Sequence, residues 1–145
     1  MNIPWYVTAV GAALIWGVHY PLVDFALKRV SVFSVLMLTV LPILLLMPVF
    51  MRDIARDLDA VRELTGIEQG MIAAIGLTSL LGAVLLYLSI AGKNATLASL
   101  IEITYPVFVA FFAYAIFRHV HVNASVIVGG LLVMAGAGLI IYNNQ

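Results

Sequence analysis

The stretch that decides the fold class is Met71–Ala91, which reads MIAAIGLTSLLGAVLLYLSIA. Its 21 residues include no charged side chain. A helix needs about 20 mostly apolar residues to cross the roughly 30 Å hydrocarbon core of a bilayer. Inside that core only helices and closed barrels satisfy every backbone polar group, and an unbroken apolar run of this length is typical of a helix. The segment therefore predicts a transmembrane helix.

The rest of the chain has the same character. Four further segments are long and apolar enough to span a membrane, namely residues 3–27, 32–50, 95–117 and 122–142. Apolar residues make up 64% of the 145 residues and charged residues only 10%, whereas about a quarter of a soluble protein is charged. The sequence predicts an all-α polytopic membrane protein of about five transmembrane helices, 3–27, 32–50, 71–91, 95–117 and 122–142, within one domain over residues 1–145.

The charged residues are concentrated between the second and third predicted spans. Eight of the fourteen lie between Arg52 and Glu68. Apolar residues recur among them at helical spacing, at Ile54, Leu58, Val61 and Leu64. This pattern predicts a short amphipathic helix that lies in the membrane interface. The alternative is a solvated connector whose spacing is incidental.

Composition excludes several classes of protein. The net charge is zero, so no overall field attracts nucleic acid. The chain has no cysteine, which excludes disulfides, thiolate catalysis and cysteine–metal sites. His119 and His121 form an H-x-H pair, but no third ligand follows nearby, so we expect no metal site. No nucleophile elbow, phosphate-binding loop or carboxylate pair is present, and we expect neither an enzyme nor a cofactor.

Glu102 is the most informative residue, because it lies well inside the fourth span. A carboxylate there is costly unless it is protonated, paired or hydrated. Pro106 lacks a backbone N–H, so the Glu102 carbonyl loses its helical partner. Ser99 and Tyr105 extend the same face. We predict that Glu102, Ser99, Tyr105 and Pro106 line a substrate or proton pathway; a purely structural carboxyl is the alternative.

The first span carries an aromatic and titratable stripe. Trp16, His19 and Tyr20 are spaced i, i+3 and i+4, which places them on one helix face. Pro21 follows directly and frees a backbone carbonyl one turn earlier. A histidine titrates near neutral pH, so His19 is a candidate for a proton relay; a packed histidine is the alternative. We predict that these three side chains line the pathway, with the hydroxyl of Tyr87 from the third span.

Small residues and asparagines mark helix contacts and helix starts. Glycine permits the close backbone approach on which helix association in lipid depends, and it recurs at Gly82, Gly129, Gly130 and Gly136. These four glycines are predicted to lie in helix packing contacts or a dimer interface. Asn94 and Asn123 stand within glycosylation sequons, but both begin a predicted helix, where an asparagine side chain caps exposed N–H groups. We predict caps.

Three motifs together resemble one family. The run ALIWG at 13–17 resembles the "WG" of the first helix in the EamA branch of the drug/metabolite transporter superfamily. The run from Ala95 to Pro106 is similar to that family's small-residue stretch ending in proline, and Gly129–Gly136 to its last-helix signature. Thr39 stands where the family often has an arginine. The resemblance covers nearly the whole chain, which has the size of one five-helix EamA repeat.

The resemblance implies a secondary transporter of small metabolites or drug-like compounds. Such proteins are built from inverted halves around a central site. One repeat supplies one half, so we expect a dimer that works by alternating access, either an antiparallel homodimer or a pair with a homologue. Glu102 would bind the substrate or the coupling proton. The alternatives are a non-transporting subunit, a lipid-interacting scaffold and a lipid-carrier flippase.

The distribution of basic residues predicts little preference for either orientation. One side of the membrane receives four basic residues from the loops and the other side three. They are Arg52, Arg56, Arg62 and Arg118 against Lys28, Arg29 and Lys93. Orientation follows such counts, so we predict dual topology. The expected location is a prokaryotic inner membrane.

Overall fold

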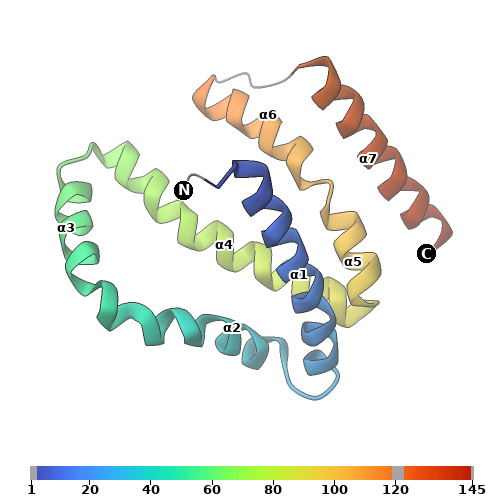
Figure 1. The fold of residues 1–145 in the computed structure, drawn as a ribbon, viewed down its shortest axis with the longest axis horizontal. Helices are drawn as coiled ribbons and strands as arrows, with labels where there is room; N and C mark the ends of the chain where they lie inside the picture. The colour runs from blue at the N-terminus through green and yellow to red at the C-terminus, as the bar shows by residue number, and fades with distance from the viewer. Residues whose placement is uncertain (1–2, 119–122, 145) are drawn as a thin grey trace. The chain divides into compact units, whose positions relative to one another are not determined.

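A computed structural model describes residues 3–118 and 123–144, and in this part of the chain all regular secondary structure is helical. The elements, shown in Figure 1, are α1 (Trp5–Leu27), α2 (Val32–Leu46), the 3₁₀ helix η1 (Met47–Phe50), α3 (Met51–Arg62), α4 (Gly66–Gly92), α5 (Ala95–Glu102), α6 (Tyr105–Phe117) and α7 (Ala124–Asn143).

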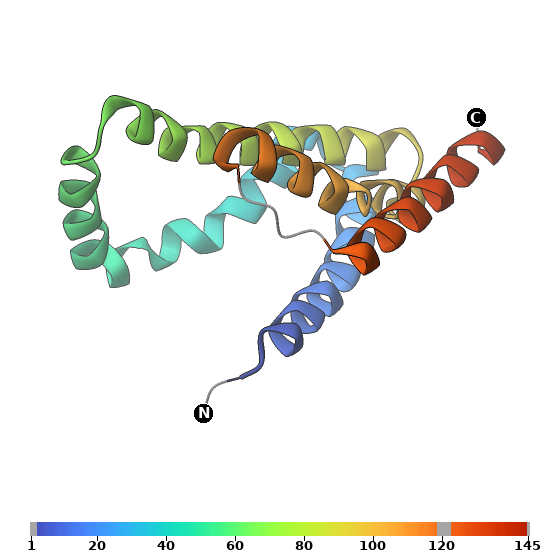
Figure 2. The same cartoon turned by 90° about the horizontal axis from the view of Figure 1, so that it is seen from above.

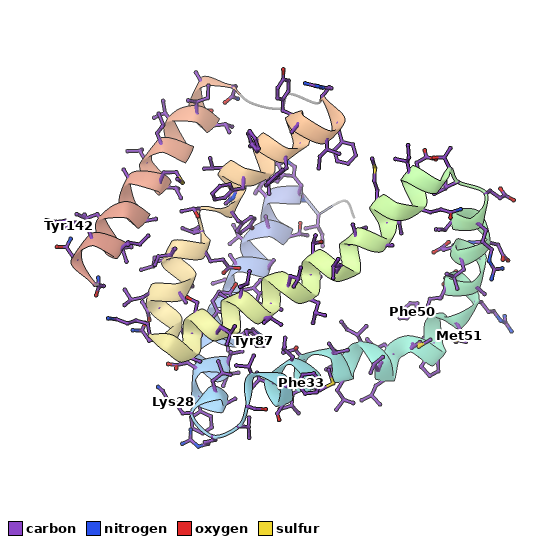
Figure 3. All side chains as sticks on the ribbon, turned by 180° about the vertical axis from the view of Figure 1, so that it is seen from behind. Lys28, Phe33, Phe50, Met51, Tyr87 and Tyr142 are labelled. Atoms are coloured by element: carbon purple, nitrogen blue, oxygen red, sulfur yellow. The ribbon has the colours of Figure 1, made fainter. Side chains whose placement is uncertain are left out.

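Within the part of the chain that the structure describes, five helical stretches are long and apolar enough to cross a membrane. They are Trp5–Leu27, Val32–Arg62, Gly66–Gly92, Ala95–Phe117 and Ala124–Asn143. Most large apolar side chains are exposed, including Phe33, Phe50 and Tyr142, which project from their helices in Figure 3. Such a surface suits a solvent of lipid chains, which is as apolar as the side chains themselves. The predicted all-α polytopic membrane fold is confirmed.

The chain divides into two compact units. One consists of Met1–Leu22 with Gly92–Gln145, and the other of Val23–Ala91. The first unit thus contains most of α1 together with α5, α6 and α7. The second contains the last turns of α1, followed by α2, η1, α3 and nearly all of α4.

In the second unit, charged side chains gather where α1 ends. Lys28 pairs with Asp24 at 3.2 Å, and the Arg29 guanidinium lies 3.6 Å from the centre of the Phe25 ring. Long basic side chains at a helix end reach the lipid headgroups while their stems stay in apolar surroundings. The arrangement marks the point where this helix leaves the hydrocarbon. Ser31 then caps α2 by accepting a hydrogen bond from the Ser34 N–H.

The segment after α2 forms the predicted amphipathic helix. The chain passes from α2 through η1, which contains Pro48, into α3, and α3 points away from the direction of α2 in Figure 1. The charges of α3 pair along its own surface, as in the 2.9 Å contact between Arg62 and Asp59. Ile54 and Leu58 are exposed. Its location in the membrane interface stays a prediction.

In the first unit, asparagine side chains begin two helices. The Asn94 side chain accepts a hydrogen bond from the Leu97 N–H at 2.8 Å and starts α5. The Asn123 side chain accepts from the Val126 N–H at 3.0 Å and starts α7. Both predicted caps are confirmed.

The helices α5 and α7 contact each other and lie side by side in Figure 2. At one end of this pair, the Lys93 ammonium donates a hydrogen bond to the Asn144 carbonyl at 2.9 Å. A cation at this place also interacts favourably with the partial negative charge at the C-terminal end of α7. The start of α5 is therefore tied to the end of α7.

The fourth span is two helices rather than one. α5 ends at Glu102, and α6 begins at Tyr105. The Thr104 N–H bonds to the Ile101 carbonyl at 3.1 Å, which tightens the last turn of α5. Pro106 has no N–H to offer the Glu102 carbonyl, so the helical ladder is interrupted here. The sequence predicted one span over 95–117 with a kink at the proline; the structure has Ala95–Phe117 as one span, interrupted at Ile103 and Thr104 between α5 and α6 (Figure 1).

Candidate functional site

A hydrogen bond between α1 and α5 defines the candidate site. The Tyr20 hydroxyl donates to Oε2 of Glu102 at 2.6 Å, and both residues are half-buried. This distance lies within the ordinary range of O–H···O hydrogen bonds. The structure therefore brings together two predicted site residues that lie 82 positions apart.

The pair lies well inside the apolar helices. Seven residues separate Tyr20 from Leu27, where α1 ends, and seven separate Glu102 from Ala95, where α5 begins. At 1.5 Å of rise per residue, Tyr20 stands about 10 Å from Leu27, and Glu102, the last residue of α5, stands about 10 Å from Ala95, where the fourth span begins. If the ends of these spans lie at the membrane surface, the carboxyl stands at a depth where a charge needs local partners.

Three rings of α1 cluster around this hydrogen bond. The Trp16 ring centre lies 5.0 Å from that of His19, edge to face, and 5.5 Å from that of Tyr20. α1 continues without a break through Pro21, which follows the cluster. Trp16 is 51% exposed, and its ring neighbours that of Tyr20, the donor of the hydrogen bond.

The Glu102 carboxyl has no basic partner within the described residues. The ion pairs found there lie at the end of α1 and along α3. Lys93, the basic residue nearest to Glu102 in sequence, donates to Asn144 instead. The arrangement leaves the carboxyl with a single hydrogen-bond donor from the described protein, the Tyr20 hydroxyl. It can therefore accept a proton or a further donor from a ligand.

Each of the other predicted pathway residues has its own surroundings within its unit. Ser99 donates its hydroxyl to the Thr96 carbonyl of its own helix at 3.0 Å. Tyr105 begins α6 and is 59% exposed, and Pro106 follows it directly after the break. Tyr87 is buried, at 3% exposed, within the Val23–Ala91 unit.

Of the four predicted packing glycines, Gly130 lies closest to another helix. A Cβ atom built on Gly130 would lie 3.3 Å from a methyl group of Val107 in α6. The same construction at Gly82, Gly129 and Gly136 meets no atom within 4 Å. Gly130 therefore permits the approach of α7 to α6, and the other three leave open space.

An apolar cavity of about 400 Å³ lies between the break and α7, and sequence reasoning missed it. Pro106, Val107 and Ala110 line one side, and α7 lines the other from Val126 to Met134. Its lining has no charged or polar side chain, so it suits a lipid chain or the apolar part of a ligand. The adjacent glycines and the proline were visible in the sequence, but their facing arrangement was not.

A metal centre has no support in the described chain. His119 and His121, at which we expected no metal site, lie outside the described residues. Within residues 3–118 and 123–144, no three histidine, aspartate or glutamate side chains come close enough to hold a metal ion.

Within residues 3–118 and 123–144, five helical stretches long and apolar enough to cross a bilayer define an integral membrane protein. The chain belongs to the EamA-like transporter family, whose family model matches residues 3–142. Members of this family are transporters rather than enzymes. No curated protein and no solved structure matches the chain.

Proposed function

We propose that this chain is one half of a secondary transporter of small metabolites or drug-like compounds in a prokaryotic inner membrane. The observation that carries the proposal is the Tyr20–Glu102 hydrogen bond, whose two residues stand about 10 Å of helical rise from Leu27 and Ala95, the nearer ends of their two apolar spans. Ionisable groups at such depth are rare in membrane proteins, and they mark substrate and ion pathways. Glu102 is the group that binds the coupling proton or a positively charged part of the substrate.

The broken fourth span supports this role. Transporter sites are commonly formed by discontinuous helices, whose free backbone groups and helix ends coordinate the transported species. The C-terminal end of α5 lies at Glu102, and a helix C-terminus carries partial negative charge. The Glu102 carboxylate and the C-terminal end of α5 both carry negative charge, so both attract a cation or a proton.

The transporter is proposed to work as a dimer. Inverted halves surround the central site in transporters of this plan, and the chain has the helices of one half. Gly129 and Gly136 on α7 leave open space within the chain, which permits a second α7 to approach closely. The partner is an antiparallel second copy or a paired homologue, and the two halves alternate access to the site.

The test is uptake into proteoliposomes under an imposed proton gradient, with a panel of small metabolites and drug-like compounds. Glu102→Gln keeps the shape of the side chain but cannot release a proton. We expect this variant to insert and dimerise normally and to lose proton-driven uptake, by about 100-fold or more, as is usual for a group essential to proton transfer. Glu102→Asp should retain part of the uptake.

The outcome that contradicts the proposal is equally definite. If Glu102→Gln takes up every substrate as wild type does at each pH, the carboxyl is structural and the mechanism is wrong. If wild type moves no compound in the panel, a non-transporting subunit or lipid-interacting scaffold is favoured.

A second candidate, a lipid-carrier flippase, is supported by the apolar cavity between α6 and α7. A lipid chain fits an apolar groove of this kind while its headgroup contacts polar residues further along. In this case fluorescent lipid would move between leaflets in the same proteoliposomes, and enlarging Gly130, which lines the cavity, would slow it.

A further inference from the structure

We infer that Tyr20 determines which cations the Glu102 carboxyl accepts, and that the site takes an alkylammonium group in preference to a guanidinium group. The inference rests on the proposed function, because it names the chemical class of ligand for the same carboxyl. It is carried by the geometry of the hydrogen bond between the Tyr20 hydroxyl and Oε2 of Glu102.

Tyr20 occupies one of the two carboxylate oxygens. Its hydroxyl lies 2.6 Å from Oε2, whereas Oε1 accepts no hydrogen bond from any residue that the structure describes. A carboxylate offers both oxygens to a planar guanidinium, which binds through two parallel N–H···O bonds. With Oε2 already engaged and the phenol ring beside it, the two-point contact requires displacement of the tyrosine hydroxyl.

An ammonium group has no such requirement. It is a compact charge with three rotatable donors, and it needs only one oxygen at short distance. Oε1 supplies that oxygen while the Tyr20 hydrogen bond stays in place. With Tyr20 bound to Oε2, only Oε1 of the carboxylate is open to a cation. A guanidinium then loses one of its two hydrogen bonds, whereas an ammonium keeps its single short contact, so the ammonium binds more tightly.

The neighbouring rings favour cations without distinguishing between them. Trp16 stands 5.5 Å from Tyr20, ring centre to ring centre, and has an open surface. Ammonium and guanidinium groups are both attracted to aromatic faces. Selectivity between the two must therefore come from the tyrosine hydroxyl, and general affinity for cations from the rings and the carboxylate.

The experiment is a binding titration of the purified full-length chain in detergent, with butylammonium and butylguanidinium as probes. The chain has two tryptophans, and Trp5→Phe leaves Trp16 as the single tryptophan, which can be excited selectively over the tyrosines. In this background we expect butylammonium to bind about tenfold more tightly than butylguanidinium, as the loss of one charge-assisted hydrogen bond predicts.

Tyr20→Phe removes the hydroxyl and keeps the ring. We expect it to strengthen butylguanidinium binding and to reduce the preference for ammonium severalfold. The matched control is Tyr142→Phe, which removes the same hydroxyl from an exposed position near the end of α7 and should leave the preference unchanged. Glu102→Gln should weaken both probes.

Three results would overturn the inference: no binding of either probe to wild type, equal binding of both, or an unchanged preference in Tyr20→Phe. The wild-type comparison decides the matter even if the variant fails to fold. Uptake of the same two probes separates this inference from the proposed function. Preferential binding without uptake refutes transport alone, and uptake without preference refutes the role of Tyr20 alone.

Discussion

At the scale of single residues, the contact between Gly130 and Val107 shows how closely two helices of this protein approach. The missing side chain of Gly130 allows a Val107 methyl group to lie where a Cβ atom would be crowded, at 3.3 Å. Gly138, on the same helix, has no neighbour within 4 Å of its would-be Cβ. Gly130 and Gly138 lie in the same helix and differ in whether a neighbour is close, so replacing each by alanine isolates the effect of the contact with Val107.

We expect Gly138→Ala to stabilise the chain and Gly130→Ala to stabilise it less or to destabilise it. Replacing glycine by alanine inside a helix contributes about 0.5–1 kcal/mol by restricting the unfolded chain. At Gly130 this gain is offset, because Val107 must move by a few tenths of an ångström. Denaturant unfolding in detergent micelles measures both variants. Equal shifts in the two unfolding midpoints would show that the contact with Val107 is not tight.

The Tyr20–Glu102 pair was only half predictable from sequence. A carboxylate inside an apolar run is conspicuous in any sequence, and the aromatic stripe at i, i+3 and i+4 is visible by its spacing. Their pairing is different, because it depends on how α1 packs against α5. Residues 82 positions apart come into contact only through tertiary structure, and no local sequence pattern predicts that contact.

At the scale of elements, the break between α5 and α6 is the feature with the most direct consequence. Pro106→Ala supplies an N–H for the Glu102 carbonyl and should join the two helices into one. An interior proline costs a helix about 3 kcal/mol, so we expect the variant to be more stable by up to about that amount. We also expect it to lose uptake, because the helix end at Glu102 disappears.

Pro42→Ala is the control for this prediction. Pro42 lies inside α2, which continues through it without interruption, so its replacement should leave uptake unchanged. Stability comes from unfolding in micelles and uptake from proteoliposomes. Full uptake by Pro106→Ala would mean that the break is tolerated rather than used.

The helices themselves were largely predictable, since apolar length in the sequence is enough to identify a span. The amphipathic spacing of Ile54 and Leu58 was also enough to predict α3. The division of the fourth span into α5 and α6 could not be predicted, because a proline inside a helix can produce either a mild kink or a helix end. The apolar cavity was beyond sequence reasoning for a similar reason, since it exists only where α7 faces Pro106 and Val107.

At the scale of the whole molecule, the balance of basic residues predicts how copies insert. The predicted five-span topology places four arginines on one side and three basic residues on the other, and such a small difference does not fix orientation. We expect reporters fused to the C-terminus to be active on both sides of the membrane in similar amounts. Thr65→Lys with Gln69→Lys adds two charges beside α4 and should drive the chain into one orientation, with these lysines in the cytoplasm.

A single orientation of the unmodified chain would contradict this prediction. It would then favour pairing with a homologue of opposite bias over an antiparallel homodimer. Co-expression with such a homologue and recovery of a mixed complex would establish that alternative.

The divided fourth span also links the protein to the thickness of its membrane. α5 has 8 residues and α6 has 13, and neither alone reaches across a hydrocarbon layer of about 30 Å. Their combined reach depends on the angle at the two residues between them. A continuous helix accommodates a thinner bilayer by tilting as a whole. The helices α5 and α6 could instead change the angle between them, next to Glu102. We therefore expect the acyl-chain length of the surrounding lipids to alter the geometry around the Glu102 carboxyl.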